Sequence, residues 1–354
     1  MTIPPKNKIR VLVVDDSAVN RRAITSRLQA SGEVEVAARA ADGTEALKLA
    51  HELKPDVITL DLEMPKMDGF SFLRLLMATR PTPVIVVSSY SQKENVFRAL
   101  ELGAVDFVAK PDRTGPEAEE PLPGLVDKVL SFRTEPTINV RPSAPPPPRP
   151  RTDSIPGIEG SKLTPRTVVA IVASTGGPSA LSQLFSALPS RGNYAVLVAQ
   201  HMPERFTRTF AERLDKNSRF KVSEAVDGDL VLSRTAFVCP GRQCMELEQV
   251  AGGQLRLRVG PPSPDDRYAP SGNRLLSSTA RALRSRAIGI VLTGMGDDGT
   301  EGARAIIQLG GVVLAESEET AVINGMPGSA LRANAVTQMV PLHRIAEVLD
   351  GLLA

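Results

Sequence analysis

Apolar runs and amphipathic stretches alternate through the first third of the chain. Strands are predicted over residues 9–14, 33–40, 56–60, 84–88 and 106–109, and helices over residues 16–31, 43–54, 69–79, a segment ending at Leu102, and 122–132. Five successive strand–helix units predict a doubly wound parallel sheet. Side chains that follow its strands should meet at one edge, where ligands of such sheets bind.

The same pattern returns in the second half of the chain. Strands are predicted over residues 167–173, 195–200, 287–293 and 312–315, the first three each followed by a turn and a helical pattern. Turn residues and apolar–polar alternation over residues 221–259 predict a β-hairpin excursion from this parallel sheet. The expected fold class is therefore α/β, with two doubly wound parallel-sheet domains, the second of them Rossmann-like with a hairpin excursion.

A proline-rich segment separates the two halves. Residues 134–160 read TEPTINVRPSAPPPPRPRTDSIPGIEG. Proline prevents helix and central strand there, and few apolar residues are left to bury. We therefore predict a semi-extended linker over residues 133–162, between one domain at residues 1–132 and another at residues 163–354.

Composition narrows the classes of function. The chain has 354 residues, enough for two domains with separate cores, and a net charge of +2, which is too small to indicate a nucleic-acid or membrane surface. It contains no apolar run of about eighteen residues and no signal-peptide pattern, so we expect a cytoplasmic protein without membrane insertion. Two cysteines, Cys239 and Cys244, make neither a disulfide framework nor a metal site by themselves.

Polar residues stand at the ends of four strands predicted in the first domain. They are Asp15 and Asp16 after the first strand, Asp61 after the third, Ser88 at the end of the fourth and Lys110 after the fifth. Three carboxylates in one cleft repel each other unless a cation lies among them, and hard oxygen ligands suit Mg²⁺. A carboxylate can accept a phosphoryl group as an acyl phosphate, whose oxygens a hydroxyl and a lysine would bind. The alternative, unrelated surface acids in loops, does not explain why all five positions fit.

These residues lie in motifs of a known family. Residues 9–132 resemble the receiver domain of two-component response regulators, through VLVVDDS (11–17), LDLEMPKMDG (60–69), VSS (87–89) and VDFVAKP (105–111). The resemblance implies a histidine kinase as phosphodonor. It also implies a role for six residues: Asp61 as the phosphoacceptor, Asp15 and Asp16 as Mg²⁺ ligands with it, Ser88 and Phe107 as the switch residues, and Lys110 as the phosphate-binding lysine.

The second domain begins with a strand that runs into a serine turn. In VVAIVASTGGPSALSQLF (168–185), Ser174 is followed by Gly176, Gly177 and Pro178 and then by a helical pattern. Two glycines permit a tight turn, and the N–H groups at a helix start can point at an anion. A serine at such a turn resembles a nucleophile beside an oxyanion hole. A phosphate-binding serine or a simple turn serine would fit this segment equally well.

Two further strand ends could complete a catalytic set. His201 follows the strand at residues 195–200, whereas His51 lies in a polar predicted helix and His343 lies near the C-terminal helix. A serine esterase needs a base of this kind, and His201 is the best placed of the three histidines. The segment AIGIVLTGMGDDGTEGARAIIQLGG (287–311) places two aspartates after another strand, and an aspartate there can orient a histidine.

A dinucleotide-binding fold is the rival interpretation of that loop. Residues 294–299 form G-x-G-x-x-G, and Glu316 follows about one strand later. Asp297 and Asp298 would, however, repel a pyrophosphate at that position. In the esterase interpretation, the backbone N–H groups near Gly176 and Met295 would bind the oxyanion.

Residues 166–352 look like the catalytic domain of the chemotaxis receptor glutamate methylesterases. The matching motifs are ASTGGP (173–178), QHMP (200–203), LTGMGDDG (292–299) and GMP (325–327). The resemblance selects Asp298 over Asp297 as the catalytic aspartate, with Ser174 as nucleophile and His201 as base, and it places Thr175 and Met295 along the site. It implies hydrolysis of γ-glutamyl methyl esters on a methyl-accepting chemoreceptor to glutamate and methanol, without a cofactor. Some members of the family also deamidate glutamine.

Two positions depart from the family pattern. Cys244 stands where a histidine is expected, and Asn273 stands where the family has aspartate. Neither is expected to touch the catalytic residues, but both bear on substrate recognition. A receiver with a nucleotide-binding output and a catalytically inactive adaptor are the alternative functions. We further expect a monomer in which the unphosphorylated receiver covers the Ser174 cleft.

Overall fold

The computed structural model describes residues 8–89, 92–110, 122, 124–133 and 163–353. The chain divides into two compact units, residues 1–144 and 145–354, each of which is described by itself. The predicted linker, residues 133–162, lies outside the described residues apart from Arg133.

The first unit is a five-stranded, wholly parallel sheet in the order β2-β1-β3-β4-β5. Its strands are β1 (Ile9–Val14), β2 (Val34–Ala40), β3 (Val57–Leu60), β4 (Val84–Ser88) and β5 (Asp106–Ala109). Its helices are α1 (Ala18–Ala30), α2 (Gly43–Leu53), α3 (Gly69–Thr79), α4 (Lys93–Glu101) and α5 (Leu125–Leu130). Every predicted strand and helix is present, although the last helix begins at Leu125 rather than at residue 122.

Three helices of this unit begin where a polar side chain caps them. The side chains of Ser17, Asp42 and Asp68 accept hydrogen bonds from backbone N–H groups in the first turns of α1, α2 and α3. A cap satisfies donors that the helix itself leaves unpaired. The loops that follow β1 and β3 therefore end at fixed points, which positions the acidic residues in those loops.

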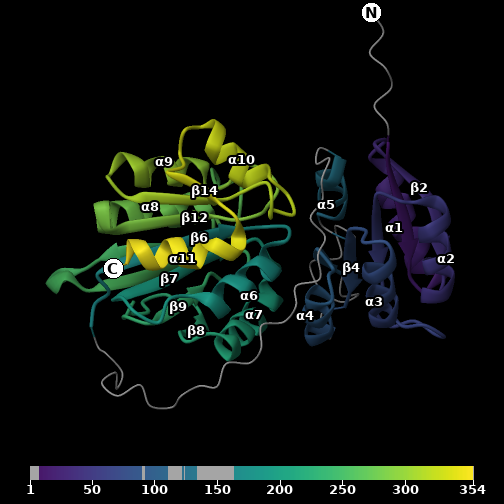
Figure 1. Cartoon of the computed structure of the whole chain (residues 1–354), viewed down its shortest axis with the longest axis horizontal. Coiled ribbons are helices and arrows are strands. Elements are labelled where there is room, and N and C mark those ends of the chain that lie inside the picture. The colour runs from purple at the N-terminus through teal and green to yellow at the C-terminus, as the bar shows by residue number, and fades with distance from the viewer. Residues whose placement is uncertain (1–7, 90–91, 111–121, 123, 134–162, 354) are drawn as a thin grey trace, which may run out of the picture. The chain divides into compact units, whose positions relative to one another are not determined.

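The second unit is a seven-stranded parallel sheet in the order β14-β13-β12-β6-β7-β9-β8 (Figure 1). Its strands are β6 (Thr167–Ala173), β7 (Tyr194–Gln200), β8 (Lys221–Glu224), β9 (Thr235–Val238), β12 (Ala287–Val291), β13 (Val312–Glu316) and β14 (Gln338–Val340). Its helices are α6 (Gly177–Ala187), α7 (Glu204–Asn217), α8 (Gly272–Leu283), α9 (Thr300–Gln308), α10 (Gly325–Arg332) and α11 (Leu342–Leu352).

The prediction of a hairpin over residues 221–259 is confirmed for the second part of this range and wrong for the first part. Strands β8 and β9 pair in parallel and extend the main sheet beside β7. Only β10 (Cys244–Gln249) and β11 (Leu255–Gly260) form an antiparallel hairpin, which packs on α8. The alternation arises because β8 is the edge strand of the sheet, so that its side chains are alternately exposed and buried.

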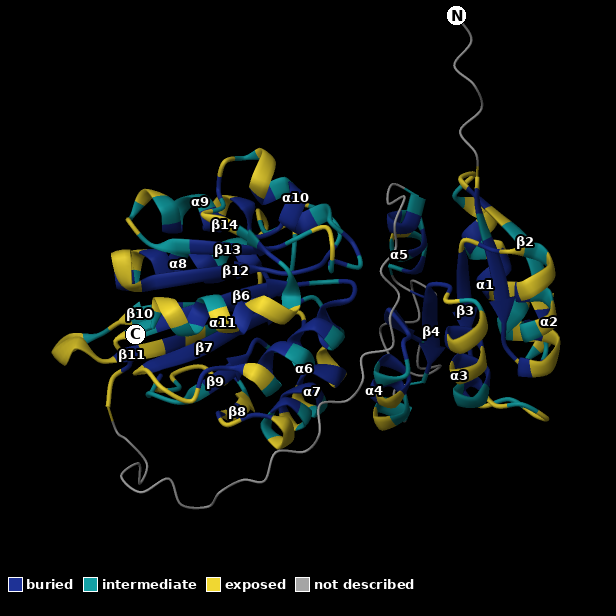
Figure 2. Ribbon diagram, in the orientation of Figure 1, coloured by how far each residue is buried: buried dark blue, intermediate teal, exposed yellow. Residues whose placement is uncertain are grey.

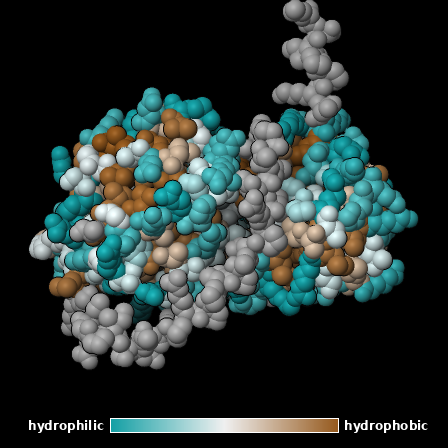
Figure 3. Space-filling model, in the orientation of Figure 1, coloured by the Kyte–Doolittle hydropathy of each residue, from teal (hydrophilic) through white to brown (hydrophobic). Residues whose placement is uncertain are grey.

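The central strands are buried on both faces (Figure 2). All residues of the interior strands β3, β4, β7 and β12 are buried, as are those of the edge strand β5, and most of their side chains are aliphatic. On the face drawn in Figure 3, hydrophobic residues are interspersed with hydrophilic ones. Within the described part of the chain, no helix combines the length and the apolar character needed to cross a membrane.

Candidate active site and phosphorylation site

Each sheet has one point at which the strand order reverses. In the first unit this point lies between β1 and β3, and in the second it lies between β6 and β12. Ligands of open α/β sheets bind beyond the strand ends at such a point. Asp15, Asp16 and Asp61 follow the two strands at the first of these points, and Ser174 and Asp298 follow the two strands at the second.

Ser174 lies in a tight turn between β6 and α6. The N–H of Gly177 donates to the Ser174 carbonyl (2.8 Å), and the N–H of Ser174 donates to the Thr293 carbonyl after β12 (3.0 Å). Gly176 has a φ of +80°, and a Cβ atom there would lie 2.8 Å from Val322 Cβ. A Cβ on Gly294 would lie 2.7 Å from Ser174 Cβ. Glycine therefore lets the two loops approach each other closely around the serine.

His201 and Asp298 form a hydrogen bond beside this turn. His201 Nε2 lies 2.8 Å from Asp298 Oδ2, and Asp298 is completely buried. Because a carboxylate only accepts, Nε2 of the neutral ring carries the proton and Nδ1 holds the free lone pair. Three backbone N–H groups also donate to the carboxylate: Gly272 to Oδ2 (2.7 Å), and Asn273 (2.9 Å) and Gly299 (2.9 Å) to Oδ1.

The carboxylate thus lies at the start of helix α8. Gly272 and Asn273 are the first two residues of that helix, whose capping residue is Ser271. A helix N-terminus favours a negative charge, and a buried charge needs several donors. The prediction that Asn273 does not touch the catalytic residues is wrong, because its backbone N–H binds Asp298 and its Oδ1 accepts from the Gly302 N–H (3.0 Å). Cys244 lies farther away, with its Sγ 3.9 Å from Asp266 Oδ2.

Gln200 joins the serine and histidine loops. Its buried Nε2 donates to the carbonyls of Ser174 (2.9 Å) and His201 (3.1 Å), and the His201 N–H donates to the Ala173 carbonyl (3.0 Å). These bonds hold Ser174 and His201 side by side. Within the described residues, Ser174 Oγ makes no hydrogen bond to the imidazole. Sequence reasoning did not single out Gln200, although it precedes His201 in the QHMP motif.

The proposed oxyanion donors lie in the two loops that meet at Ser174. In the described part of the chain, neither the Gly176 nor the Met295 N–H donates a hydrogen bond. The GMP motif braces the second loop, because the Met326 N–H donates to the Gly294 carbonyl (2.8 Å). Thr175 is buried and its carbonyl accepts from Thr293 Oγ1 (2.9 Å).

Two more residues lie near this loop, and only Tyr268 had no role assigned from the sequence. Tyr268 stacks on the His201 ring, with ring centroids 5.1 Å apart and planes inclined by 9°. Glu316, the acid that the dinucleotide interpretation would place on a ribose, is completely buried, and its Oε2 accepts from the Thr293 N–H (2.9 Å). Burial raises the pKa of Glu316 to about 7. A carboxyl enclosed in this way is not available to a nucleotide, which counts against the rival interpretation.

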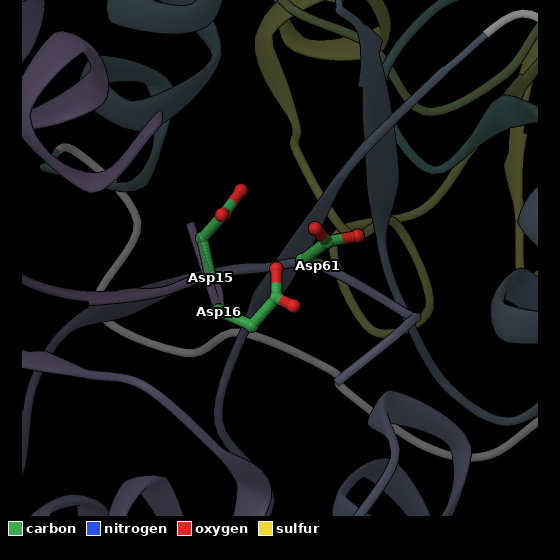
Figure 4. A group of neighbouring side chains, drawn as sticks. All are labelled: Asp15, Asp16 and Asp61. Carbon is green, nitrogen blue, oxygen red and sulfur yellow. The ribbon is translucent and has the colours of Figure 1, made fainter. Parts of the chain in front are cut away.

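The acidic residues of the first unit also converge. Asp15, Asp16 and Asp61 each offer a carboxylate oxygen, all within 4.8 Å of one another (Figure 4). Lys110 Nζ lies 2.6 Å from Asp61 Oδ2 and 2.9 Å from Asp15 Oδ2. Burial lowers the pKa of Lys110, but these ion pairs outweigh burial and raise it above its ordinary value. Burial also raises the pKa of Asp61, although Lys110 opposes that shift.

This donor set fits Mg²⁺. All three ligands are hard carboxylate oxygens, and two of the three residues, Asp15 and Asp61, are buried. The two residues predicted to form the phosphorylation switch, Ser88 and Phe107, do not direct side-chain hydrogen bonds at Asp61. Ser88 Oγ donates to Gln92 Oε1 (2.6 Å) rather than toward Asp61, and Phe107 is buried with its ring edge-on to Phe97 at 6.4 Å.

Both units are similar to known protein families. The family model described as CheB methylesterase matches residues 169–349, and the one described as response regulator receiver domain matches residues 11–115. The protein-glutamate methylesterase/protein-glutamine glutaminase 1 of Myxococcus xanthus is 49% identical over 98% of both chains. The corresponding enzyme 3 of Geobacter sulfurreducens is 44% identical over 98% of this chain and 99% of its own. The crystal structure of the Thermotoga maritima CheB methylesterase catalytic domain matches 52% of this chain and 98% of its own, with a TM-score of 0.51 and 34% identity.

Proposed function

Since the chain belongs to the CheB methylesterase family and carries a receiver domain, we propose that it is a receiver-controlled protein-glutamate methylesterase with Ser174 as its nucleophile. The observation that carries this proposal is the hydrogen bond of His201 to the buried Asp298, directly beside the Ser174 turn. A base that is oriented by a carboxylate and lies next to a serine can perform acyl transfer. The substrate is a γ-glutamyl methyl ester on a methyl-accepting chemoreceptor.

The geometry gives each group one task. Ser174 Oγ attacks the ester carbonyl carbon while Nδ1 of His201 takes the hydroxyl proton, and Nε2–H stays bonded to Asp298. The N–H groups of Gly176 and Met295 bind the oxyanion that forms. Collapse of this intermediate breaks the ester C–O bond, and His201 gives its proton to the leaving methoxide, which departs as methanol.

The acyl-enzyme is hydrolysed by the same groups. His201 Nδ1 takes a proton from water as the water oxygen attacks the γ-glutamyl ester on Ser174. The acyl C–Oγ bond then breaks, and His201 returns the proton to Ser174 Oγ. The released side chain is a glutamate carboxylate, so that negative charge returns to the receptor. The same steps deamidate a glutamine side chain, with ammonia leaving in place of methanol, which is the second activity in the names of the relatives.

The first unit supplies the control. Asp61 accepts a phosphoryl group from a histidine kinase, and Asp15 and Asp16 hold Mg²⁺ with it. The ion neutralises charge on phosphoryl oxygens when it is bound. Lys110, already paired with Asp61, binds a phosphoryl oxygen, and Ser88 leaves Gln92 to bind another. We place this activity in the cytoplasm, in a monomeric protein.

Methanol release from a methylated receptor fragment tests both halves. We expect the rate to rise when a small phosphodonor and Mg²⁺ are added. Ser174→Ala should lower the rate about 10⁴-fold or more in both conditions, as expected when a nucleophile is lost. Asp61→Ala should keep the basal rate and lose the response. A Ser174→Ala protein that keeps its rate would refute the esterase, and one that keeps its cellular effect without activity would indicate an adaptor.

A further inference from the structure

We propose that Tyr268 is a positioning residue that fixes the plane of the His201 imidazole, and that Asp297 holds it there. This inference rests on the proposed function, because it concerns the same base. The two rings lie nearly parallel, at 9°, with centroids 5.1 Å apart, and Tyr268 is only partly exposed. The stack therefore covers one face of the imidazole.

The imidazole needs such a contact. Among the described residues its ring makes one hydrogen bond, from Nε2 to Asp298, and a single bond leaves the ring free to turn about the line joining the two atoms. Turning would swing Nδ1, the nitrogen that must reach the Ser174 hydroxyl. A face-to-face contact with Tyr268 fixes the ring plane and so fixes the direction of Nδ1. A catalytic group held in its reactive orientation lowers the entropic part of the barrier.

Asp297 anchors the tyrosine from the neighbouring loop. The Tyr268 hydroxyl donates to Asp297 Oδ1 (3.0 Å), and Arg267 Nη1 lies 3.3 Å from the same oxygen. The Arg267 guanidinium also lies 5.2 Å from the centre of the Tyr268 ring. The two adjacent aspartates thus have separate tasks, since Asp298 binds the imidazole edge and Asp297 holds the ring that covers its face.

The glycine loop leaves room for this arrangement. Gly296 has a φ of +89°, and a Cβ atom there would lie 2.5 Å from the Tyr268 hydroxyl oxygen. Burial and the Asp297 hydrogen bond both raise the pKa of Tyr268, so its hydroxyl stays a neutral donor. The aromatic face also stabilises the positive charge that His201 acquires when it takes the serine proton. The stack therefore favours the transition state over the resting enzyme.

Kinetics and histidine NMR on the full chain test the proposal together. Tyr268→Leu should lower kcat for methanol release about tenfold and leave KM within about twofold, given the usual strength of a cation–aromatic contact. Tyr268→Phe, which keeps the ring but loses the hydrogen bond to Asp297, should give a kcat between those of Tyr268→Leu and the wild type. The chain has three histidines, so ¹³Cε1-labelled histidine gives three signals. The His201 signal should lie upfield from the ring current of Tyr268. It should move downfield in Tyr268→Leu, and less far in Tyr268→Phe.

A matched pair of aspartate variants tests the anchor. Asp297→Ala should lower kcat and reduce the upfield shift, whereas Asp265→Ala, in an exposed position of the same loop as Tyr268, should change neither. A wild-type kcat in Tyr268→Leu, a change confined to KM, or a His201 signal without the upfield shift would each overturn the proposal. An inactive wild-type protein would instead overturn the proposed function, and the NMR signal would then decide alone whether Tyr268 holds the imidazole.

Discussion

Two adjacent aspartates in one loop differ sharply in their surroundings. Asp298 is completely buried among backbone donors and the His201 ring, whereas the Asp297 side chain is about half exposed, at 54%, and faces Arg267. The sequence left both as candidates to orient a histidine, and only the resemblance to a known family selected Asp298. The difference arises because helix α8, which begins 26 residues before Asp298, supplies donors to Asp298.

Replacing each aspartate by asparagine separates their roles. Asp298→Asn should lower kcat by about 10² to 10⁴, because the amide NH₂ group cannot accept from His201 and would face the donors of α8. Asp297→Asn keeps an acceptor for the Tyr268 hydroxyl and loses only an exposed ion pair. We therefore expect kcat to fall at most about fivefold. Steady-state methanol release measures both. Equal losses in the two variants would contradict the assignment.

Glu316 should make the stability of the second unit depend on pH. Its folded-state pKa is about 7 against an ordinary value of 4.5, so the unfolded chain ionises first and stability falls as pH rises from about 4.5 to about 7. The loss should reach about 3 kcal/mol, because each pKa unit is worth about 1.4 kcal/mol. Glu316→Gln should remove this slope, and Glu319→Gln, an exposed neighbour, should keep it. Denaturant unfolding from about pH 5 to about pH 8 measures the slope, and a wild-type slope in Glu316→Gln would contradict the prediction.

The site residues that directly follow strands could be predicted from the sequence. Those that reach the site from irregular segments could not. Ser174, His201 and Asp298 each follow a buried apolar run, so their meeting could be expected from the parallel sheet alone. Tyr268 lies in an irregular segment before α8. The hydrophobic pattern of the sequence does not predict the path of such a segment. The only signal for it was its aromatic side chain between Arg267 and Pro270, in a chain with three tyrosines.

At the scale of elements, the start of α8 is the part of the fold that binds the proposed catalytic aspartate, Asp298. A Cβ on Gly272 would overlap Val172 Cγ2 in β6 and would lie 3.1 Å from Asp298 Oδ2. The helix can approach the sheet this closely only because residue 272 is glycine. The first turn of α8 therefore acts as part of the site through its backbone N–H groups, which bind Asp298.

Gly272→Ala should thus weaken both stability and catalysis. Overpacking of this kind costs about 1 to 3 kcal/mol, and moving the helix start away from Asp298 should lower kcat as well. Gly260→Ala is the matched control, since a Cβ atom there meets nothing within 4 Å. Denaturant unfolding and methanol release measure the two effects. A Gly272→Ala protein as stable and active as the Gly260→Ala protein would show that the helix start is not needed.

Central strands were predicted better than the edge of the second sheet. Strands β7 and β12 are buried on both faces and appear as continuous apolar runs, which have few other interpretations. Strand β8 is an edge strand in which only Val222 is fully buried, so its alternation resembled one arm of a hairpin. Which neighbour such a strand pairs with depends on long-range contacts that its own pattern does not contain.

At the scale of the whole molecule, the two sheets differ in strand order. In each of them, however, the candidate site residues follow the strands at which that order reverses. One unit gathers acidic residues after β1 and β3. The other gathers the proposed catalytic residues Ser174 and Asp298 after β6 and β12, with His201 after the neighbouring β7. Each sheet has its own buried core. In addition, the catalytic domain of the Thermotoga maritima relative has a crystal structure that this chain matches over 98% of its length. The second unit should therefore fold without the first.

Removal of the first unit tests how the receiver controls the esterase. A tether keeps the two units at high local concentration, so even a weak inhibitory contact would suffice if the unphosphorylated receiver covers Ser174, as expected from the sequence. The proposed domain 163–354 alone should then release methanol about fivefold faster, or more, than the full chain without phosphodonor, as is usual for a coupling between two sites. It should also ignore the phosphodonor, and full-length Asp61→Ala should stay at the low basal rate. Equal basal rates for the fragment and the full chain would refute occlusion and leave the esterase intact, so that control would have to act by raising the activity of the catalytic unit.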